Sequence, residues 1–420
     1  MKKRVLFGLA ITAVLVVSSF AQSNTSVRTE RVIVTNTMPL PVTQPARIPA
    51  PTPMQYVQPR VSPTPIIVGQ SQPNLASNLT YKGLSFSQIK SKMAEAKRYL
   101  QTKPLTTASS EPVLFTSIIR IAYYDTKDKR VDSVVMTKDQ FLMPDIMTML
   151  MSAAGKQVTS RTIRGNGVNT PVVIKDMNGE PYLPLVVQYP RENRGVYQEM
   201  AYYTSTHPGL VTPEVVSAGR FYVHNVVEIA RDQLRNKGYF IQPKVADIAE
   251  RLSTVEHVDH LRFRTEFHPN IYNDIFTLYA LNEGQTYRYS VSSAGAGGMV
   301  QMIGPTYRMV RARFPNAALM PDFVEGMRNH VNATQAMLLY MQMTWNDLAA
   351  SPTISNALIT GIATQEHLMA AGYNSNPAKL PGYINRGGDN WRELIPRETK
   401  IYLQIWNSLE SAVAMAPRKQ

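Results

Sequence analysis

A proline-rich tract near the N-terminus decides which part of this chain can fold into a packed domain. Of the 420 residues, ten prolines fall between Pro39 and Pro73, interleaved with Thr, Ser, Gln and Val. Such a composition cannot bury a hydrophobic core and favours an extended, polyproline-like chain. We therefore predict a disordered Pro-rich linker over residues 22–80. It serves either as a tether that holds a folded domain away from a membrane or as plain linker.

The segment before the linker has the three parts of an export signal. Residues 2–4 (Lys-Lys-Arg) are positive, residues 5–17 are apolar and uncharged, and residues 19–21 (Ser-Phe-Ala) are a site for cleavage before Gln22. The apolar run is short for a bilayer-spanning helix, which favours a signal peptide over residues 1–21. We expect the periplasm or cell envelope, with a membrane contact only if this segment is uncleaved.

The composition narrows the function classes. The chain has no cysteine, which excludes disulfides, cysteine-ligated metals and cysteine nucleophiles. It carries 44 Lys and Arg against 30 Asp and Glu, a formal charge of +14 that favours anionic wall polymers or lipid head groups as partners. General basicity without one partner is the alternative. With an export signal and no nucleic-acid motif, we expect no nucleic-acid partner and no cofactor.

Residues 81–240 have the pattern of an accessory α+β domain. Two short β-like runs, 118–124 and 131–136, flank a polar turn, and Asn178-Gly179 is a strong hairpin signal between two further apolar runs. The Met-rich segment 140–154 is interpreted as a helix whose methionines fill the core. We expect this domain to be the part that contacts any envelope protein partner.

The sequence then predicts a long helix, followed by a segment that is almost wholly helical. Thr212 is an N-cap candidate, Pro213 fits the first helical position, and Gly238 fits the residue just past the end. Over residues 241–415, apolar periodicity and Pro or Gly breaks predict six helices: 244–258, 270–283, 305–314, 321–349, 355–371 and 397–413.

Glu283 is the first candidate for chemistry. It extends the apolar face that Ile275 and Tyr279 form on the predicted helix 270–283. A carboxyl group held against an apolar surface has a raised pKa, as a general acid needs near neutral pH. The alternative is an exposed glutamate at a helix end.

Two further segments accompany this glutamate. The stretch 292–301 has three nearly adjacent glycines, which let a ligand approach the backbone, and ends on Gln301, which can hydrogen-bond a sugar. Tyr373-Asn374 offers an aromatic face and a hydroxyl for a sugar ring. The structural alternatives are a flexible loop and a tyrosine in the core.

Together these motifs resemble the soluble lytic transglycosylases, relatives of goose-type lysozyme. That family has a Glu-Ser pair, then Ser-x-x-Gly-Ala-x-Gly-Leu-Met-Gln, then Ala-Tyr-Asn-Ala-Gly. Here the matching residues are Glu283, Ser292, Gly295, Ala296, Gly298, Gln301, Tyr373 and Asn374, and Ile395–Tyr402 is similar to a later Pro-x-x-Glu-Thr-x-x-Tyr segment. The chain departs from the pattern at Gly284, where the family has Ser, at Met299-Val300 and at Ser375-Asn376.

The resemblance implies a fold class and a reaction. The fold would be a mainly α, lysozyme-like catalytic domain over residues 241–415. The reaction would cleave the MurNAc–GlcNAc β-1,4 bond of peptidoglycan glycan strands and leave 1,6-anhydroMurNAc, with Glu283 as the single general acid and base. The implied substrate contacts come from the loop and the Tyr-Asn pair: Ser292, Gly295, Ala296, Gly298, Met299, Gln301, Tyr373 and Asn374.

Other readings of the same residues stay open. A lysozyme-type hydrolase would use water, and Glu366 would then be a second carboxylate; a supporting or surface role is the alternative for that residue. A non-catalytic protein that binds or assembles cell wall is a different class, which Gly284 favours. Glu256 and His260 have metal-ligand residue types on one helix face, but no open-site zinc motif accompanies them, so a solvated helix end is the preferred interpretation.

Overall fold

The structure is a computed structural model that describes residues 84–105, 114–193, 195–282 and 284–419. The predicted signal peptide and Pro-rich linker lie outside these residues, and so does Glu283. No helix among the described residues combines the length and the apolar character that crossing a bilayer requires.

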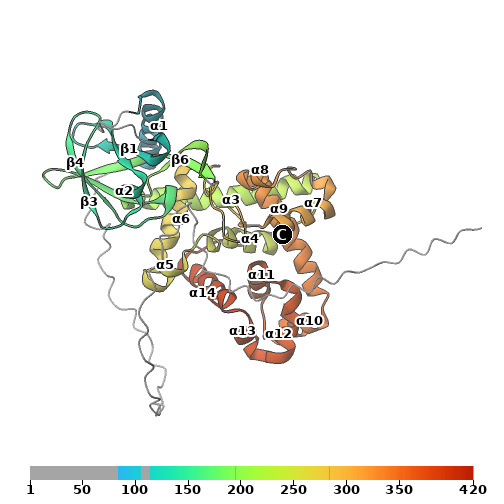
Figure 1. The fold of residues 1–420 in the computed structure, drawn as a ribbon. Coiled ribbons are helices and arrows are strands. Elements are labelled where there is room, and N and C mark those ends of the chain that lie inside the picture. Colours follow the sequence, from blue (N-terminus) through green and yellow to red (C-terminus); the bar gives the residue numbers. More distant parts are fainter. Residues whose placement is uncertain (1–83, 106–113, 194, 283, 420) are drawn as a thin grey trace, which may run out of the picture. The chain divides into compact units, whose positions relative to one another are not determined.

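The N-terminal half of the described chain is built on one antiparallel sheet, which curls into a half-barrel (Figure 1). Its path is β2-β1-β6-β5-β4-β3, and β7 pairs with β6. The seven strands are β1 (Ile118–Asp125), β2 (Arg130–Thr137), β3 (Met147–Met151), β4 (Gln157–Thr162), β5 (Val172–Asp176), β6 (Pro181–Asn193) and β7 (Val196–Thr204).

Both predicted hairpins are confirmed, and side-chain oxygens cap their turns. The β1–β2 pair closes with Asp125 opposite Arg130, and the Asp125 Oδ1 accepts the backbone N–H groups of the turn at 2.9 and 3.0 Å. In the β5–β6 turn, Gly179 has φ +87°, which suits glycine, and the Asp176 Oδ1 accepts two backbone N–H groups.

The predicted Met-rich helix 140–154 is wrong. The segment forms the end of the short helix α2 (Lys138–Leu142) and then strand β3. Met147, Met149 and Met151 are exposed, whereas Thr148 and Leu150 between them are half-buried, which is the period-two pattern of a strand. The methionines therefore do not fill the core, because alternation along an edge strand turns them to solvent.

Helices make up most of the rest of the described chain. They are α1 (Phe86–Thr102), α3 (Pro213–Asn236), α4 (Pro243–Val255), α5 (His260–Thr265), α6 (His268–Asn282), α7 (Gly304–Arg313), α8 (Phe323–Arg328), α9 (His330–Ala349), α10 (Pro352–Ile359), α11 (Gln365–Asn374), α12 (Leu380–Gly387), α13 (Trp391–Leu394) and α14 (Arg397–Ala412). The predicted N-cap of α3 is confirmed, because the Thr212 hydroxyl accepts the Val215 N–H at 3.2 Å.

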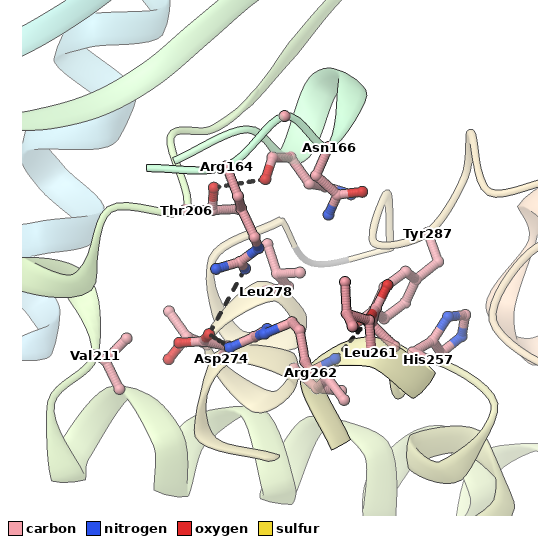
Figure 2. Close-up of a pocket in the computed structure, with 15 residues that line it drawn as sticks. Arg164, Asn166, Thr206, Val211, His257, Leu261, Arg262, Asp274, Leu278 and Tyr287 are labelled. Atoms are coloured by element: carbon pink, nitrogen blue, oxygen red, sulfur yellow. Dashed lines mark hydrogen bonds and ion pairs between the residues drawn. The ribbon is translucent and has the colours of Figure 1, made fainter. Parts of the chain in front are cut away.

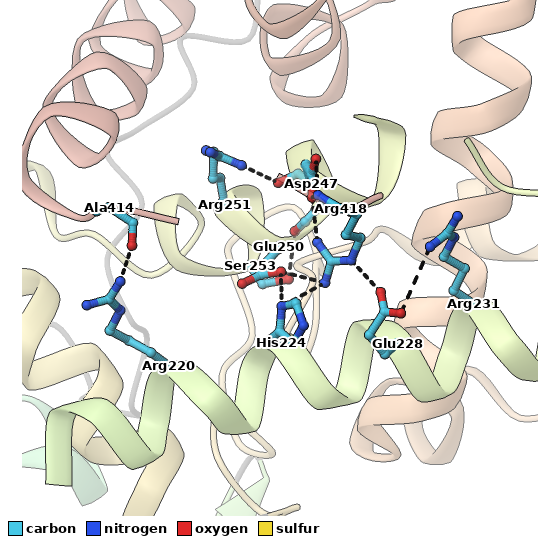
Figure 3. A network of polar contacts seen from close by, with 11 residues as sticks. Arg220, His224, Glu228, Arg231, Asp247, Glu250, Arg251, Ser253, Ala414 and Arg418 are labelled. Carbon is cyan, nitrogen blue, oxygen red and sulfur yellow. Dashed lines mark hydrogen bonds and ion pairs between the residues drawn. The ribbon is translucent and has the colours of Figure 1, made fainter. Parts of the chain in front are cut away.

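The C-terminal tail returns to α3 and α4 through one buried arginine (Figure 3). The Arg418 side chain is 4% exposed and forms ion pairs with Glu228 of α3 and with Asp247 and Glu250 of α4. The distances to the Asp247 and Glu250 oxygens are 2.9 and 2.5 Å. Burial of the Arg418 charge is tolerated only because these carboxylate partners are present.

The predicted fold class, a mainly α lysozyme-like catalytic domain beside a separate α+β accessory domain, is wrong. The fold is a curled half-barrel sheet plus helices, with about 18% of the described residues in strands and 55% in helices. That strand content is close to the ~20–25% of an average globular protein, so the molecule is not mainly α.

Packing between the sheet and the helices explains this correction. One core cluster joins Ile89 of α1, Leu185 of β6 and Val215 of α3 to Ala280 of α6. The helix that ends beside Glu283 is thus packed in the same core as the sheet. Local sequence patterns do not reveal that the sheet and the helices share this core.

Candidate functional site

The end of α6 is fixed from both sides of Glu283. Before it, the Asn282 Oδ1 accepts the backbone N–H of Thr204 at 2.9 Å, which ties the helix to β7. After it, the Gly284 N–H donates to the Tyr222 hydroxyl of α3 at 2.7 Å. The φ of Gly284 is +56°, a conformation that favours glycine. This accounts for glycine at a position where the resembling family has serine. Glu283 itself lies outside the described residues, so its burial and raised pKa remain predictions.

Tyr222 is held by a buried histidine at the start of α9. The His330 Nε2 lies 2.7 Å from the Thr286 carbonyl, which can only accept, so Nε2 carries the proton. The Nδ1 therefore accepts the Tyr222 O–H at 2.8 Å. Burial lowers the pKa of His330 to about 4, which keeps the ring neutral and this hydrogen-bond direction fixed near pH 7.

The predicted glycan loop begins with a tight, exposed turn. The Ser292 N–H donates to the Ala296 carbonyl at 2.9 Å, and the Ser292 hydroxyl accepts the Ala296 N–H at 3.0 Å. Gly295 is exposed at the tip with φ +73°. Ser292, Gly295 and Ala296 are therefore brought together, with the first two reachable from solvent.

The second half of this loop is buried. Gly298 has φ +66°, and an added Cβ there would lie 2.3 Å from the Met327 carbonyl oxygen of α8. The close neighbour that requires glycine at this position is thus the protein itself. Gln301 is 9% exposed, and its Nε2 donates to the Gly298 carbonyl at 2.9 Å. Met299 is fully buried.

Tyr373 joins this loop to α11. Its hydroxyl donates to the Val300 carbonyl at 2.6 Å, and its half-buried ring packs edge-on against Tyr340 at 6.0 Å. Two motifs that lie more than seventy residues apart in the sequence therefore meet. The next residue, Asn374, is buried, and its Oδ1 accepts the Thr399 hydroxyl at 2.9 Å.

His257 connects the same loop to the segment after α6. Its Nε2 lies 2.8 Å from the Met299 carbonyl, to which it donates. Its ring stacks on Tyr287, with 3.4 Å between centroids and 5° between planes. Three segments thus form one connected unit: the segment after Glu283, the loop that contains Met299 and the end of α11 that contains Tyr373.

Several residues that hold this unit together were not predicted from the sequence. Tyr222 and His330 gave no signal, since nothing in the sequence places them beside Gly284. Thr399 and Tyr402 lie in the segment 395–402, which does resemble the family, so that resemblance was a signal that could have identified them. The Tyr402 hydroxyl donates to the Glu256 Oε1 at 2.7 Å. In the part of the chain that the structure describes, no group of three or more His, Cys, Asp or Glu could hold a metal ion.

Comparisons of the chain with protein-family models, curated proteins and solved structures found no match.

Proposed function

We propose that this protein is a peptidoglycan lytic transglycosylase in which Glu283 is the single general acid and base. Glu283 protonates the glycosidic oxygen, and the bond from the muramyl C1 to that oxygen breaks. Glu283 then takes the proton of the muramyl C6 hydroxyl as the C6 oxygen forms a bond to C1. The ring closure consumes no water, and Glu283 ends protonated as it began, so a second carboxylate is not needed.

The observation that carries the proposal is the contact of the 292–301 loop with Tyr373 and, through His257, with Tyr287 in the segment after Glu283. The Tyr373 hydroxyl donates to the Val300 carbonyl at 2.6 Å, and His257 bridges Met299 and Tyr287. A site that holds a sugar chain over one carboxyl group needs segments fixed relative to each other within about half an ångström. Hydrogen bonds also fix the two residues that flank Glu283 in the sequence, Asn282 and Gly284.

The surroundings of Glu366 favour a mechanism with one carboxylate. Its Oε1 forms an ion pair with the Lys244 ammonium at 2.8 Å. Burial raises the pKa of Glu366, but the hydrogen bonds and charge of Lys244 and nearby groups outweigh it and leave the pKa below its ordinary value. The second carboxylate of a hydrolase acts as a general base or nucleophile, and an ion-paired carboxylate with a lowered pKa is weaker in either role.

The test is digestion of purified peptidoglycan sacculi, with the products identified by mass spectrometry. The wild type, Glu283→Gln and Glu366→Gln are compared after circular dichroism has shown that all three are folded. We expect 1,6-anhydro-muramyl ends from the wild type and from Glu366→Gln. The Glu283→Gln variant should lose at least about 100-fold in rate, the usual contribution of a general acid.

The other outcomes each point elsewhere. Reducing muramyl ends, lost in Glu366→Gln, would replace the proposal with a hydrolase that uses water and two carboxylates. Sacculi that bind folded wild-type protein but give no products would establish a non-catalytic wall-binding protein. Products that persist undiminished in Glu283→Gln would remove Glu283 from the mechanism.

A further inference from the structure

A cavity of about 220 Å³ is lined in part by the stacked rings of His257 and Tyr287 (Figure 2). Its walls come from the segment 164–169 after β4, from Thr206 and Val211 after β7, and from Asp259, α5, α6 and Tyr287. None of the residues predicted to bind glycan lines it. The sheet and the helices therefore build this cavity jointly.

Three buried side chains in the cavity wall have a polar atom without a hydrogen-bond partner among the described residues. These atoms are the Asn169 Oδ1, the Thr277 Oγ1 and the Tyr287 hydroxyl. Their residues are 5%, 2% and 3% exposed. A buried polar atom left without a partner is destabilising, so three around one cavity point to a ligand that supplies the missing donors and acceptors.

Two arginines line the cavity, and they differ in how fully they are paired. Arg262 forms hydrogen bonds with both Glu266 oxygens and with the Asp274 Oδ2, at 2.6–2.9 Å. Arg164 approaches the same Asp274 oxygen only to 3.9 Å, beyond hydrogen-bonding distance. Figure 2 shows its guanidinium pointing into the cavity toward Asp274. Burial lowers the pKa of Arg164, the sign of a guanidinium whose pairing does not offset its loss of water.

The charges and the size of the cavity define the ligand class. The lining holds two arginines and two aspartates, Asp259 and Asp274, so its formal charge is balanced. A ligand with a net charge would upset that balance, whereas one with both charges keeps it. The volume is below the ~300–1,000 Å³ of pockets for drug-sized ligands. Val211, Ile275 and Leu278 add an apolar wall.

We propose that this cavity binds a small zwitterion of the amino-acid class. The carboxylate meets the Arg164 guanidinium, and the ammonium group donates to the Asn169 Oδ1. Thr277 and Tyr287 complete the hydrogen bonds, and the side chain of the ligand lies against the apolar wall. This inference does not rest on the proposed glycan cleavage, and its test involves no turnover.

The test is isothermal titration calorimetry on the full chain with glycine, L-alanine, D-alanine and then the remaining proteinogenic amino acids. Acetate with methylammonium supplies the two charges unlinked, and N-acetylglucosamine supplies a neutral polyol. We expect at least one amino acid to bind with a Kd of about 1 mM or tighter and neither control to bind comparably.

Two matched variants place the binding in this cavity. Arg164→Gln removes the charge that holds the carboxylate, and we expect affinity to fall at least about tenfold. Arg161→Gln, on strand β4 and outside the cavity, makes the same change at a partly exposed arginine and should bind as the wild type does. Thermal unfolding of both variants without ligand checks that they are folded.

The results that would overturn the proposal are specific. Absence of binding by every amino acid would show that the cavity is not a zwitterion site. Equal binding by N-acetylglucosamine would assign it to a neutral sugar. Binding that Arg164→Gln leaves unchanged would move the site elsewhere on the molecule.

Discussion

At the scale of single residues, two buried histidines are neutral in the folded protein and titrate on unfolding. His330 and His207 are 4% and 0% exposed, and burial lowers their pKa values to about 4 and about 3. The unfolded chain takes up these protons first, below the ordinary pKa of 6.5. The free energy of unfolding is therefore highest above pH 6.5. It falls as the pH drops from 6.5 to the folded-state pKa of each histidine.

Replacement of His330 by Gln should remove its share of this pH dependence. Between about pH 7.5 and about pH 4.5, the free energy of unfolding of the wild type should fall by up to about 2–3 kcal/mol more than that of the variant. The reason is that only the wild type has a histidine at position 330 to take up a proton on unfolding. Urea unfolding of both proteins across this range measures the difference, and the contribution of His207 cancels. A stability difference that stays constant with pH would show that the pKa of His330 is the same in the folded protein as in the unfolded chain.

The sequence motifs did not predict what each candidate site residue contacts. The proximity of the 292–301 loop to Tyr373 fits the order of the motifs. However, Gly298 and Gln301 were interpreted as ligand contacts, and both face neighbouring parts of the chain. A glycine required by packing and one required by a ligand are identical in sequence, and only the Met327 carbonyl beside Gly298 distinguishes them.

At the scale of elements, α3 and α6 cross where α3 has no side chain. A Cβ added at Gly219 would lie 1.8 Å from the Phe276 carbonyl oxygen of α6, so the two helices would have to separate. This crossing supports the two residues that flank Glu283, since Tyr222 is one turn farther along α3. The distance between the two helices is thus part of the geometry of the site.

We expect Gly219→Ala to destabilise the protein by about 2–3 kcal/mol or more. Alanine gains about 1 kcal/mol of helix propensity, but the backbone clash exceeds it. Ser217→Ala, on an exposed position of the same helix, should change stability by less than about 0.5 kcal/mol. Urea unfolding of both variants decides the matter, and a neutral Gly219→Ala would mean that the helices are not in contact at this point.

Elements with strong local signals were predicted from sequence, and elements set by their surroundings were not. The caps of α3 and the Asn178-Gly179 turn are confirmed because each depends on a few adjacent residues. The single predicted helix 321–349 is instead α8 and α9, separated at Asn329, whose side chain accepts the Asn332 N–H at 2.9 Å and caps a new helix. An internal asparagine that starts a second helix looks, in sequence, like a tolerated helical residue.

At the scale of the whole molecule, the fold depends on contacts between segments that are remote in sequence. The Tyr203 hydroxyl of β7 donates to the Gln285 carbonyl at 2.6 Å, beside the β7–Asn282 hydrogen bond. The domain boundary near residue 240 was placed by a change from mixed to helical pattern, which is a local property. Local patterns contain no information on whether the segments on either side share a core, as Val215 and Ala280 do.

Limited proteolysis of the full chain tests this shared core. If the sheet and the helices unfold together, a nonspecific protease should leave a resistant fragment that contains both β1–β7 and α3–α14, with early cuts in the predicted linker at residues 22–80. Arg418→Ala should add early cuts after residue 412, because the tail loses its ion pairs with α3 and α4. The contrary result is a resistant fragment of residues 245–410 alone, from which the sheet is digested away. That result would show that the helical part folds without the sheet, and that the hydrogen bonds from β7 to Asn282 and Gln285 join two separately stable domains.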